Sequence, residues 1–258
     1  MVADVLTQPR TESLPETWSL WRYRHVAGLL RRGGRPSDSL IDLGCGAGNV
    51  TRFLADELGI SRVVGVEEDP VQIREARRLG LEVRAASLLD ESLPERIAER
   101  FPERFQVALL GDVLHHLTGR TIEDSFRRVR RVLAAAAALL EKGGTLIVAE
   151  PVYRCRWLRD GTYHLKRTVS RWRRGRLELG PRWLNVGPPV VRFFDRRELL
   201  ALIEGSGLRV EAVVESDHQR LAGVFARGRI TLLAQPARST SSESGRSTAT
   251  ATRSPERR

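Results

Sequence analysis

Three glycines alternate with small residues at Gly44, Gly46 and Gly48, between an apolar run and a sequence typical of a helix. Glycine costs backbone entropy, so this cluster indicates either a tight turn with positive φ or a backbone that approaches something bulky. An acid, Asp42, stands directly before the cluster. The spacing departs from the G-x-G-x-x-G of dinucleotide-binding loops because Asn49 occupies the third glycine position, which disfavours NAD. An ordinary strand–helix loop is the alternative.

A second acid lies where a nucleoside ligand would need one. The run VVGVEEDP predicts a strand that ends at Glu67, 23 positions after Gly44. An acid at the end of the second strand can accept hydrogen bonds from both hydroxyls of a ribose. Asp69 is expected to cap the next helix and Glu68 to lie in solvent, so Glu67 is the better candidate.

Residues that could move a proton follow the later strands. His115 and His116 come directly after RFQVALLGD, and Tyr153 and His164 come after GTLIVAEP. Each could act as a general base if it lies within reach of the proton. The alternative for the two adjacent histidines is a packing role in their loop. Glu150, at the end of its strand, either faces a pocket or anchors a loop.

These residues must be positioned by a sheet, because strand and helix patterns alternate five times. The predicted strands are SLIDLG, SRVVGVEE, LEVRAAS, RFQVALLGD and GTLIVAEP. Such alternation indicates right-handed βαβ crossovers and a parallel sheet. LRVEAVVES and LAGVFARGRITLLAQP are then expected to add an antiparallel pair. Ligands of such sheets bind at the carboxyl ends of the strands, where the glycine loop lies.

The two ends of the chain read differently from this middle part. Residues 1–16 are expected to be irregular, and a helix is expected to follow. Its apolar face is predicted to contain Trp18, Trp21, His25 and Leu29. The tail from Pro236 is rich in Ser, Thr and Arg without apolar periodicity, so residues 236–258 are expected to be disordered.

The composition of the chain limits the classes of protein to which it can belong. The 258 residues are 41% hydrophobic, and no apolar run reaches the roughly 18 residues of a membrane span. The N-terminus shows no apolar signal core, so a cytoplasmic location is expected. Cys45 and Cys155 form neither a disulfide framework nor a metal-ligand spacing, so no metal is expected.

The formal net charge of +11 is concentrated in one segment. Residues 153–197 hold 13 basic side chains and three acids, with several aromatic residues among them. Arginine interleaved with aromatic rings suits a planar anionic small molecule, and it would also suit RNA. The third interpretation is a solvated basic helix, since 41 of the 43 basic residues are arginine, as codon bias would produce.

The chain resembles class I S-adenosylmethionine-dependent methyltransferases. The resemblance lies in IDLGCGAGN, VVGVEEDP, FQVALLGDVLHHL and RRVLAAAAALLEKGGTLIVAEP, and it covers residues 35–234. It implies a doubly wound, Rossmann-like α/β fold of seven strands, mostly parallel with an antiparallel C-terminal strand. Within the superfamily the chain is most similar to small-molecule enzymes of the ubiquinone/menaquinone type. The implied organisation is a helical segment over the cofactor site (1–34), a methyltransferase domain (35–235) with a helical basic substrate cover (151–192), and the tail.

The resemblance also implies S-adenosylmethionine as cofactor and assigns residues to it. Asp42 would hold the amino group, Glu67 the ribose, and Asp112 would line the methionine end. Ser87 stands where the family often has an Asp for the adenine, so Leu88 would pack on that ring. The full set of candidate cofactor residues is Asp42, Gly44, Cys45, Gly46, Gly48, Glu67, Glu68, Ser87, Leu88 and Asp112.

The implied reaction is methyl transfer to a small, anionic or aromatic acceptor by O- or C-methylation. The candidate catalytic residues are His115, His116, Tyr153 and His164. The candidate substrate residues are Arg154, Trp157, Arg167 and Arg171. The alternatives are an RNA methyltransferase that uses the basic segment 153–197, and a non-catalytic relative. The chain is expected to be a monomer or a homodimer.

Overall fold

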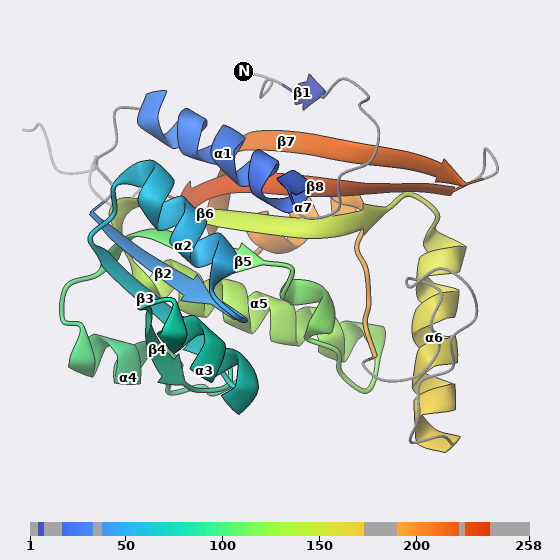
Figure 1. Cartoon of the computed structure of the whole chain (residues 1–258). Helices are drawn as coiled ribbons and strands as arrows, with labels where there is room; N and C mark the ends of the chain where they lie inside the picture. The colour runs from blue at the N-terminus through green and yellow to red at the C-terminus, as the bar shows by residue number, and fades with distance from the viewer. Residues whose placement is uncertain (1–4, 8–16, 33–37, 173–189, 222–224, 238–258) are drawn as a thin grey trace, which may run out of the picture.

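All seven predicted strands lie side by side in one sheet (Figure 1). The computed structural model describes residues 5–7, 17–32, 38–172, 190–221 and 225–237. An eighth, short strand, β1, lies at one edge, so the expectation of irregular chain up to residue 16 was wrong for these three residues. The strands are β1 (Val5–Thr7), β2 (Ser39–Leu43), β3 (Arg62–Glu67), β4 (Glu82–Ala85), β5 (Phe105–Gly111), β6 (Leu140–Tyr153), β7 (Leu208–Leu221) and β8 (Phe225–Pro236).

The order of the strands places a switch point at the glycine loop. The sheet runs β1-β7-β8-β6-β5-β2-β3-β4, and β8 alone of the described strands is antiparallel to its neighbours. From β2 the chain moves outward to β3 and β4, and then returns to the other side of β2 with β5 and β6. The crevice between the carboxyl ends of β2 and β5 is therefore the expected ligand site.

Helices cover both faces of the sheet (Figure 1). One face packs against α1, α2 and α3, and the other against α4, α5 and α7. Side chains alternate along the strands, so that Leu40 and Leu109 face α1 and α2 whereas Ile41 and Leu110 face the opposite layer. The helices are α1 (Thr17–Arg32), α2 (Asn49–Leu58), α3 (Pro70–Arg78), α4 (Leu93–Arg100), α5 (Ile122–Leu139), α6 (Arg156–Trp172) and α7 (Arg196–Glu204).

The first helix exists as predicted but turns a different face to the core. The buried side chains of α1 are Tyr23, Val26, Ala27 and Leu30, which pack with residues of α2 and the sheet. His25 and Leu29, on the predicted face, are only half-buried. The side chains of Trp18 and Trp21 lie outside the described part of the structure, and Tyr23 is a buried residue of this helix that the predicted face did not contain.

Beyond β6 the regular alternation ends, as the sequence predicted. The helix α6 projects away from the sheet at the carboxyl ends of the strands (Figure 1), and a segment at 190–195 returns to α7. The tail was predicted to be disordered from Pro236, but Pro236 ends β8 and Ala237 N–H donates to Gly207 O, while residues 238–258 lie outside the described residues. Within the described ranges, no helix combines the length and apolar character that crossing a membrane requires.

Candidate functional site

The glycine loop between β2 and α2 has the backbone that its sequence predicts. Gly44, Gly46 and Gly48 all have positive φ, at 90°, 54° and 84°. A Cβ built on Gly44 would lie 2.6 Å from Val113 Cγ2, and one on Gly48 would lie 2.4 Å from Leu81 Cδ1. At Gly46 the nearest atom would be Gln72 Oε1 at 3.8 Å, an ordinary van der Waals contact, so this residue is not crowded. The outer glycines therefore allow close packing, and the middle one leaves room for a ligand.

Replacing Gly48 with alanine should reduce stability through both its φ and its crowded surroundings. The left-handed backbone costs alanine about 1–2 kcal/mol, and the clash with Leu81 and Ala76 adds about 1–3 kcal/mol. Gly59, with φ 69° and no atom within 4 Å of a built Cβ, is the matched control for the backbone cost alone. Urea unfolding should show the larger loss in Gly48→Ala, and equal losses in both variants would contradict this account.

Glu67 is held against the glycine loop by three backbone N–H groups. Its Oε2 accepts from the Gly46 N–H at 3.0 Å, and its Oε1 accepts from Glu68 and Asp69 at 2.9 and 3.0 Å. A carboxylate offers about four acceptor positions, so about one remains. Glu68 is exposed and its carboxylate points to no described partner. The geometry thus leaves Glu67 one hydrogen bond for a ligand, where the sequence suggested two.

Asp42, at the end of β2, is a buried carboxyl group directly beneath the loop. It is 3% exposed, and Thr51 Oγ1 donates to its Oδ2 at 2.5 Å. Burial raises the pKa of Asp42 from 3.8 to about 7, against the hydrogen bond from Thr51, and the charge of Glu67 raises it further. Burial also raises the pKa of the Cys45 thiol to about 12, so this cysteine stays neutral and unreactive.

Ser87 and Leu88 follow β4 on the other side of the loop. Both are half-buried, and Leu88 Cδ1 would lie 3.6 Å from a Cβ on Gly44. Leu89 N–H donates to Ser87 Oγ at 3.5 Å, a long contact that leaves the hydroxyl able to donate. Leu88 therefore lines the same space as the glycine loop.

The loop after β5 lies across the switch point from the glycine loop. Asp112 has φ 59°, an unusual backbone for a residue other than glycine, and its N–H donates to Ala149 O at 2.8 Å. Its carboxylate pairs with Arg229 of β8. Tyr23 of α1 also reaches this loop, because a Cβ on Gly111 would lie 2.8 Å from the Tyr23 hydroxyl. Outliers of this kind gather at functional sites.

The two adjacent histidines have different surroundings. His115 is buried, and its Nδ1 lies 2.7 Å from Oε2 of Glu150, which is 0% exposed. His116 is exposed at the surface, 4.2 Å from His115 between ring centroids. Desolvation by the surrounding protein lowers the pKa of His116 to about 4, and the electrostatic effect of the neighbouring His115 acts in the same direction. His116 is therefore a weak base, whereas His115 has a carboxylate partner.

Aromatic rings continue from the histidines across to β6. Phe193 stacks on His115 at 5.4 Å and lies 4.4 Å from Tyr153, whose side chain is buried. Backbone bonds fix this arrangement, since Arg192 N–H donates to His115 O and Tyr153 N–H donates to Phe194 O. The structure thus brings together two of the predicted catalytic residues, His115 and Tyr153, through a phenylalanine that the sequence did not single out.

The remaining predicted residues are on or next to α6. Arg154 and His164 are exposed. Arg167 donates to Gly119 O, as does the Tyr163 hydroxyl, so it ties α6 to the loop before α5. The side chains of Trp157 and Arg171 lie outside the described part of the structure. Arg167 thus has a structural contact already, whereas Arg154 is free to meet solvent or a ligand.

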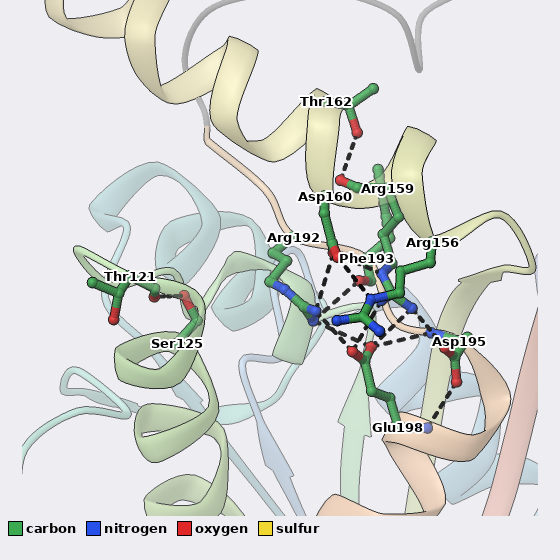
Figure 2. Close-up of polar contacts among 10 residues, drawn as sticks. All are labelled: Thr121, Ser125, Arg156, Arg159, Asp160, Thr162, Arg192, Phe193, Asp195 and Glu198. Carbon is green, nitrogen blue, oxygen red and sulfur yellow. Dashed lines mark hydrogen bonds and ion pairs between the residues drawn. The ribbon is translucent and has the colours of Figure 1, made fainter.

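Two arginines of the basic segment are buried in an ionic cluster that sequence reasoning missed (Figure 2). Arg159 lies 2.8 Å from Asp195 and 3.0 Å from Glu198, and Arg192 lies 2.9 Å from Glu198. Asp160 approaches both arginines. We call these five residues the buried ionic cluster. Its partners lie up to 39 positions apart, so no local pattern signals it.

The chain was compared with known proteins. The family model described as "Methyltransferase domain" matches residues 41–146. An uncharacterized methyltransferase of Schizosaccharomyces pombe is 35% identical over 111 residues, which are 42% of this chain and 40% of that protein. Residues 41–146 are thus similar in sequence to a methyltransferase domain. This chain thus spans less than half of that relative's length.

Solved structures share the fold of the methyltransferase domain and its additions. A protein of Methanosarcina mazei titled as a SAM-dependent methyltransferase is 15% identical, with a TM-score of 0.56 over 81% of this chain and 98% of its own. A Clostridium acetobutylicum S-adenosylmethionine-dependent methyltransferase is 13% identical, with a TM-score of 0.56 over 85% and 92%. At these identities the likeness shows the fold, and the titles of both solved structures name S-adenosylmethionine as the methyl donor of those proteins.

The residues of the site fit this cofactor. The uncrowded backbone at Gly46 would let its methionine part approach, and the buried carboxyl of Asp42 lies two residues before the loop begins. The remaining acceptor position of Glu67 would suit a ribose hydroxyl, and Leu88 offers an apolar surface for a flat ring. When bound, S-adenosylmethionine supplies an activated methyl group, so the protein mainly aligns the acceptor.

Proposed function

We propose that the protein transfers a methyl group from S-adenosylmethionine to a small acceptor that is aromatic or anionic, by O- or C-methylation. The observation that supports this most directly is the contact between Gly46 N–H and Glu67 Oε2 at the switch point of the sheet. This hydrogen bond joins the glycine loop, which follows β2, to Glu67 at the end of β3, the next parallel strand along the chain. In open α/β sheets a glycine-rich loop with an acid on the neighbouring strand binds nucleotides, the acid on the ribose hydroxyl, which supports a nucleoside cofactor here.

In this proposal the cofactor lies along the carboxyl ends of β2, β3 and β5. Asp42 holds the amino group, Glu67 a ribose hydroxyl, and Ser87 with Leu88 the adenine. Asp112 lines the methionine end, and the loop around Gly44, Cys45, Gly46 and Gly48 follows the backbone of the ligand. Tyr23 at the Gly111 contact supports a role for α1 as part of the cofactor cover.

The acceptor is proposed to bind on the ring surface formed by His115, His116, Phe193 and Tyr153. Its aromatic character suits a planar molecule, through offset stacking. Arg154 and its neighbours on α6 would meet a negative charge on such an acceptor, with Trp157, Arg167 and Arg171 as further candidates and His164 as a more distant base. Arg159 and Arg192 are buried in the ionic cluster, so two arginines of the basic segment are unavailable to RNA phosphates.

Glu67→Gln is expected to weaken binding of S-adenosylhomocysteine by about 1.5–3 kcal/mol, the contribution of one hydrogen bond to a charged group. Glu68→Gln, one position along and exposed, is the matched control and should change binding little. Isothermal titration calorimetry measures both affinities, and urea unfolding checks that each variant is folded. If the two variants lose affinity equally, the ribose acid has been misplaced. If the unchanged protein binds NAD and no S-adenosylhomocysteine, the proposed function fails.

A further inference from the structure

The helix α6 turns polar and charged side chains, rather than an apolar stripe, toward the rest of the protein. Lys166 is only 7% exposed and Tyr163 is fully buried, whereas Leu165 in the same turn is 51% exposed. A surface helix ordinarily shows the reverse, with apolar residues inside and charged residues outside. We call the side of the helix formed by Tyr163, Lys166 and Arg167 the inner face of α6. This face is built to meet polar groups.

The inner face of α6 lies on the loop that follows β5. The Tyr163 hydroxyl donates to Gly119 O at 2.9 Å, and Nη1 of Arg167 donates to the same carbonyl. Gly119 comes three residues after His116, one of the rings proposed to meet the acceptor. The pKa of His116 is lowered by desolvation and by its neighbouring histidine, and also by the charge of Lys166. The Lys166 ammonium therefore lies near this ring surface.

Arg167 is half-buried and keeps most of its donors. Its Nη1 donates to Gly119 O and, at 3.2 Å, to the oxygen of Tyr163, and both of these partners are uncharged. Within the described ranges, no carboxylate pairs with this guanidinium, and its Nε and Nη2 make no hydrogen bond. That edge offers the two parallel N–H groups that bind a planar carboxylate. Arg159 of the same helix differs, because three carboxylates surround it (Figure 2).

Codon bias does not account for the inner face of α6. The chain uses arginine for 41 of its 43 basic residues, and its other lysine, Lys142, is exposed. A lysine at the buried position 166 departs from that bias. Arg154 is exposed, and an ion pair formed in water contributes little to binding. The half-buried guanidinium of Arg167 would attract an anion more strongly, because less water screens it.

We propose that Arg167 and Lys166 form an anion subsite for the acceptor, and that the acceptor is an aromatic carboxylic acid. Arg167 binds the carboxylate through Nε and Nη2, and Lys166 adds a second positive charge. The aromatic ring lies on the surface of His116, Phe193 and Tyr153. The carboxylate is a binding group, and the methyl group goes to another atom. This inference rests on the proposed function and narrows its acceptor from aromatic or anionic to both.

A carboxylate suits this subsite better than a phosphate does. Glu150 and Asp112 place two carboxylates at the same end of the sheet, where they pair with His115 and Arg229. A doubly charged phosphate ester would meet more repulsion from these acids than a singly charged carboxylate. The chemistry of the subsite therefore favours one negative charge on a planar group.

The binding test uses acids and amides that differ only in charge. Benzoate, phenylacetate and hydrocinnamate are each compared with their primary amides, by ligand NMR, on the protein saturated with S-adenosylhomocysteine. At neutral pH and low salt these acids are ionised. At least one acid should bind about 10–100-fold more tightly than its amide, as expected for hydrogen bonds to a charged group. Phenyl phosphate should bind more weakly than this acid.

Variants of α6 assign the preference to the subsite. Arg167→Met should weaken binding of the acid to about the level of its amide and leave the amide unchanged, and Lys166→Met should also reduce the preference. Arg167→Lys, which keeps the charge but loses the planar fork, should show an intermediate preference. Arg156→Met, on the exposed side of the same helix, is the control and should keep the full preference.

Tyr163→Phe separates recognition of the acid from a structural role of Arg167. This variant removes the other hydrogen bond from the inner face of α6 to Gly119 O. If Arg167 only ties the helix to the loop, Tyr163→Phe and Arg167→Met should weaken acid and amide alike, and the proposal is then wrong. If Arg167 binds the carboxylate, only Arg167→Met should abolish the difference between acid and amide.

Calorimetry with S-adenosylhomocysteine separates this inference from the proposed function. If the unchanged protein binds S-adenosylhomocysteine but no acid binds more tightly than its amide, the subsite is wrong and the proposed function stands. Tighter binding of phenyl phosphate than of every acid, or an unchanged preference in Arg167→Met, would also overturn the subsite. If the unchanged protein does not bind S-adenosylhomocysteine, the proposed function itself is wrong. Retained binding of S-adenosylhomocysteine in each variant shows that it is folded.

Discussion

Replacing Arg159 with methionine is expected to lower the free energy of unfolding by about 3–5 kcal/mol, the usual loss when one partner of a buried ion pair is removed. The Arg159 side chain is 1% exposed and donates to Asp160, Asp195 and Glu198. Without it, Arg192 still pairs with Asp160 and Glu198, but Asp195 loses its arginine partner. Methionine keeps much of the volume, so the loss reports the uncompensated charge rather than a cavity.

Arg156→Met is the matched control on the same helix. Arg156 is 84% exposed and pairs only weakly with Asp160, at 3.5 Å. An exposed pair of this kind contributes about 0–1 kcal/mol. Urea unfolding of the two variants therefore compares a buried with a surface arginine in one charge cluster. Similar small losses in both would mean that the cluster contributes no more than a surface ion pair.

The same variant should loosen a defined part of the chain. The cluster joins α6, the segment 190–195 and the start of α7, where Asp195 and Glu198 also form the capping box. Hydrogen exchange should therefore accelerate in α6 and at the start of α7 of Arg159→Met before it changes in β2 and β3. Binding of S-adenosylhomocysteine should be retained, because the glycine loop does not contact the cluster.

Much of this fold follows from local sequence signals. The strands β2, β3 and β5 are short, mostly apolar runs, and α3, α5 and α7 each begin at a residue whose side chain caps the helix. Asp69 was predicted as a helix cap and accepts from the N–H of Val71, and Thr121 and Asp195 likewise accept from the N–H groups of Asp124 and Glu198. The glycine loop was also predictable, because positive φ restricts the choice of residue.

Contacts between distant segments were not predictable in this way. Arg159 and Arg192 carry the same local signal as the exposed Arg154, and only folding brings carboxylates to them. In α1 the apolar pattern predicted a face with His25 and Leu29, whereas packing against α2 and the sheet buries the neighbouring face with Tyr23. The distance from Glu150 to His115 depends on the pairing of β5 with β6, which sequence order alone does not set.

Asp42 is expected to make stability fall as the pH rises. Burial raises the pKa of Asp42 from 3.8 to about 7 in the folded chain, although the Thr51 hydroxyl donates to it. Between these two pH values the folded chain holds a proton that the unfolded chain has released. The contribution of Asp42 to the free energy of unfolding is therefore greatest below pH 3.8. It declines by roughly 4 kcal/mol in all as the pH rises to about 7. Asp42→Asn, compared with the unchanged protein by urea unfolding across this range, should remove that slope.

Binding of the cofactor should reverse the preference of Asp42 for its proton. If Asp42 holds the positively charged amino group of S-adenosylhomocysteine, binding requires the carboxylate, and below pH 7 it must release the proton that burial retains. Affinity should then rise about tenfold for each pH unit up to about 7 and level off above it. Calorimetry at about pH 6 in two buffers of different ionisation enthalpy should detect close to one proton released.

Asp42→Asn should show neither the pH dependence of the affinity nor the proton release. Thr51→Val should move the midpoint to higher pH, because it removes the hydrogen bond that lowers the pKa of Asp42. An affinity that is the same at about pH 5.5 and 7.5 would place the amino group elsewhere.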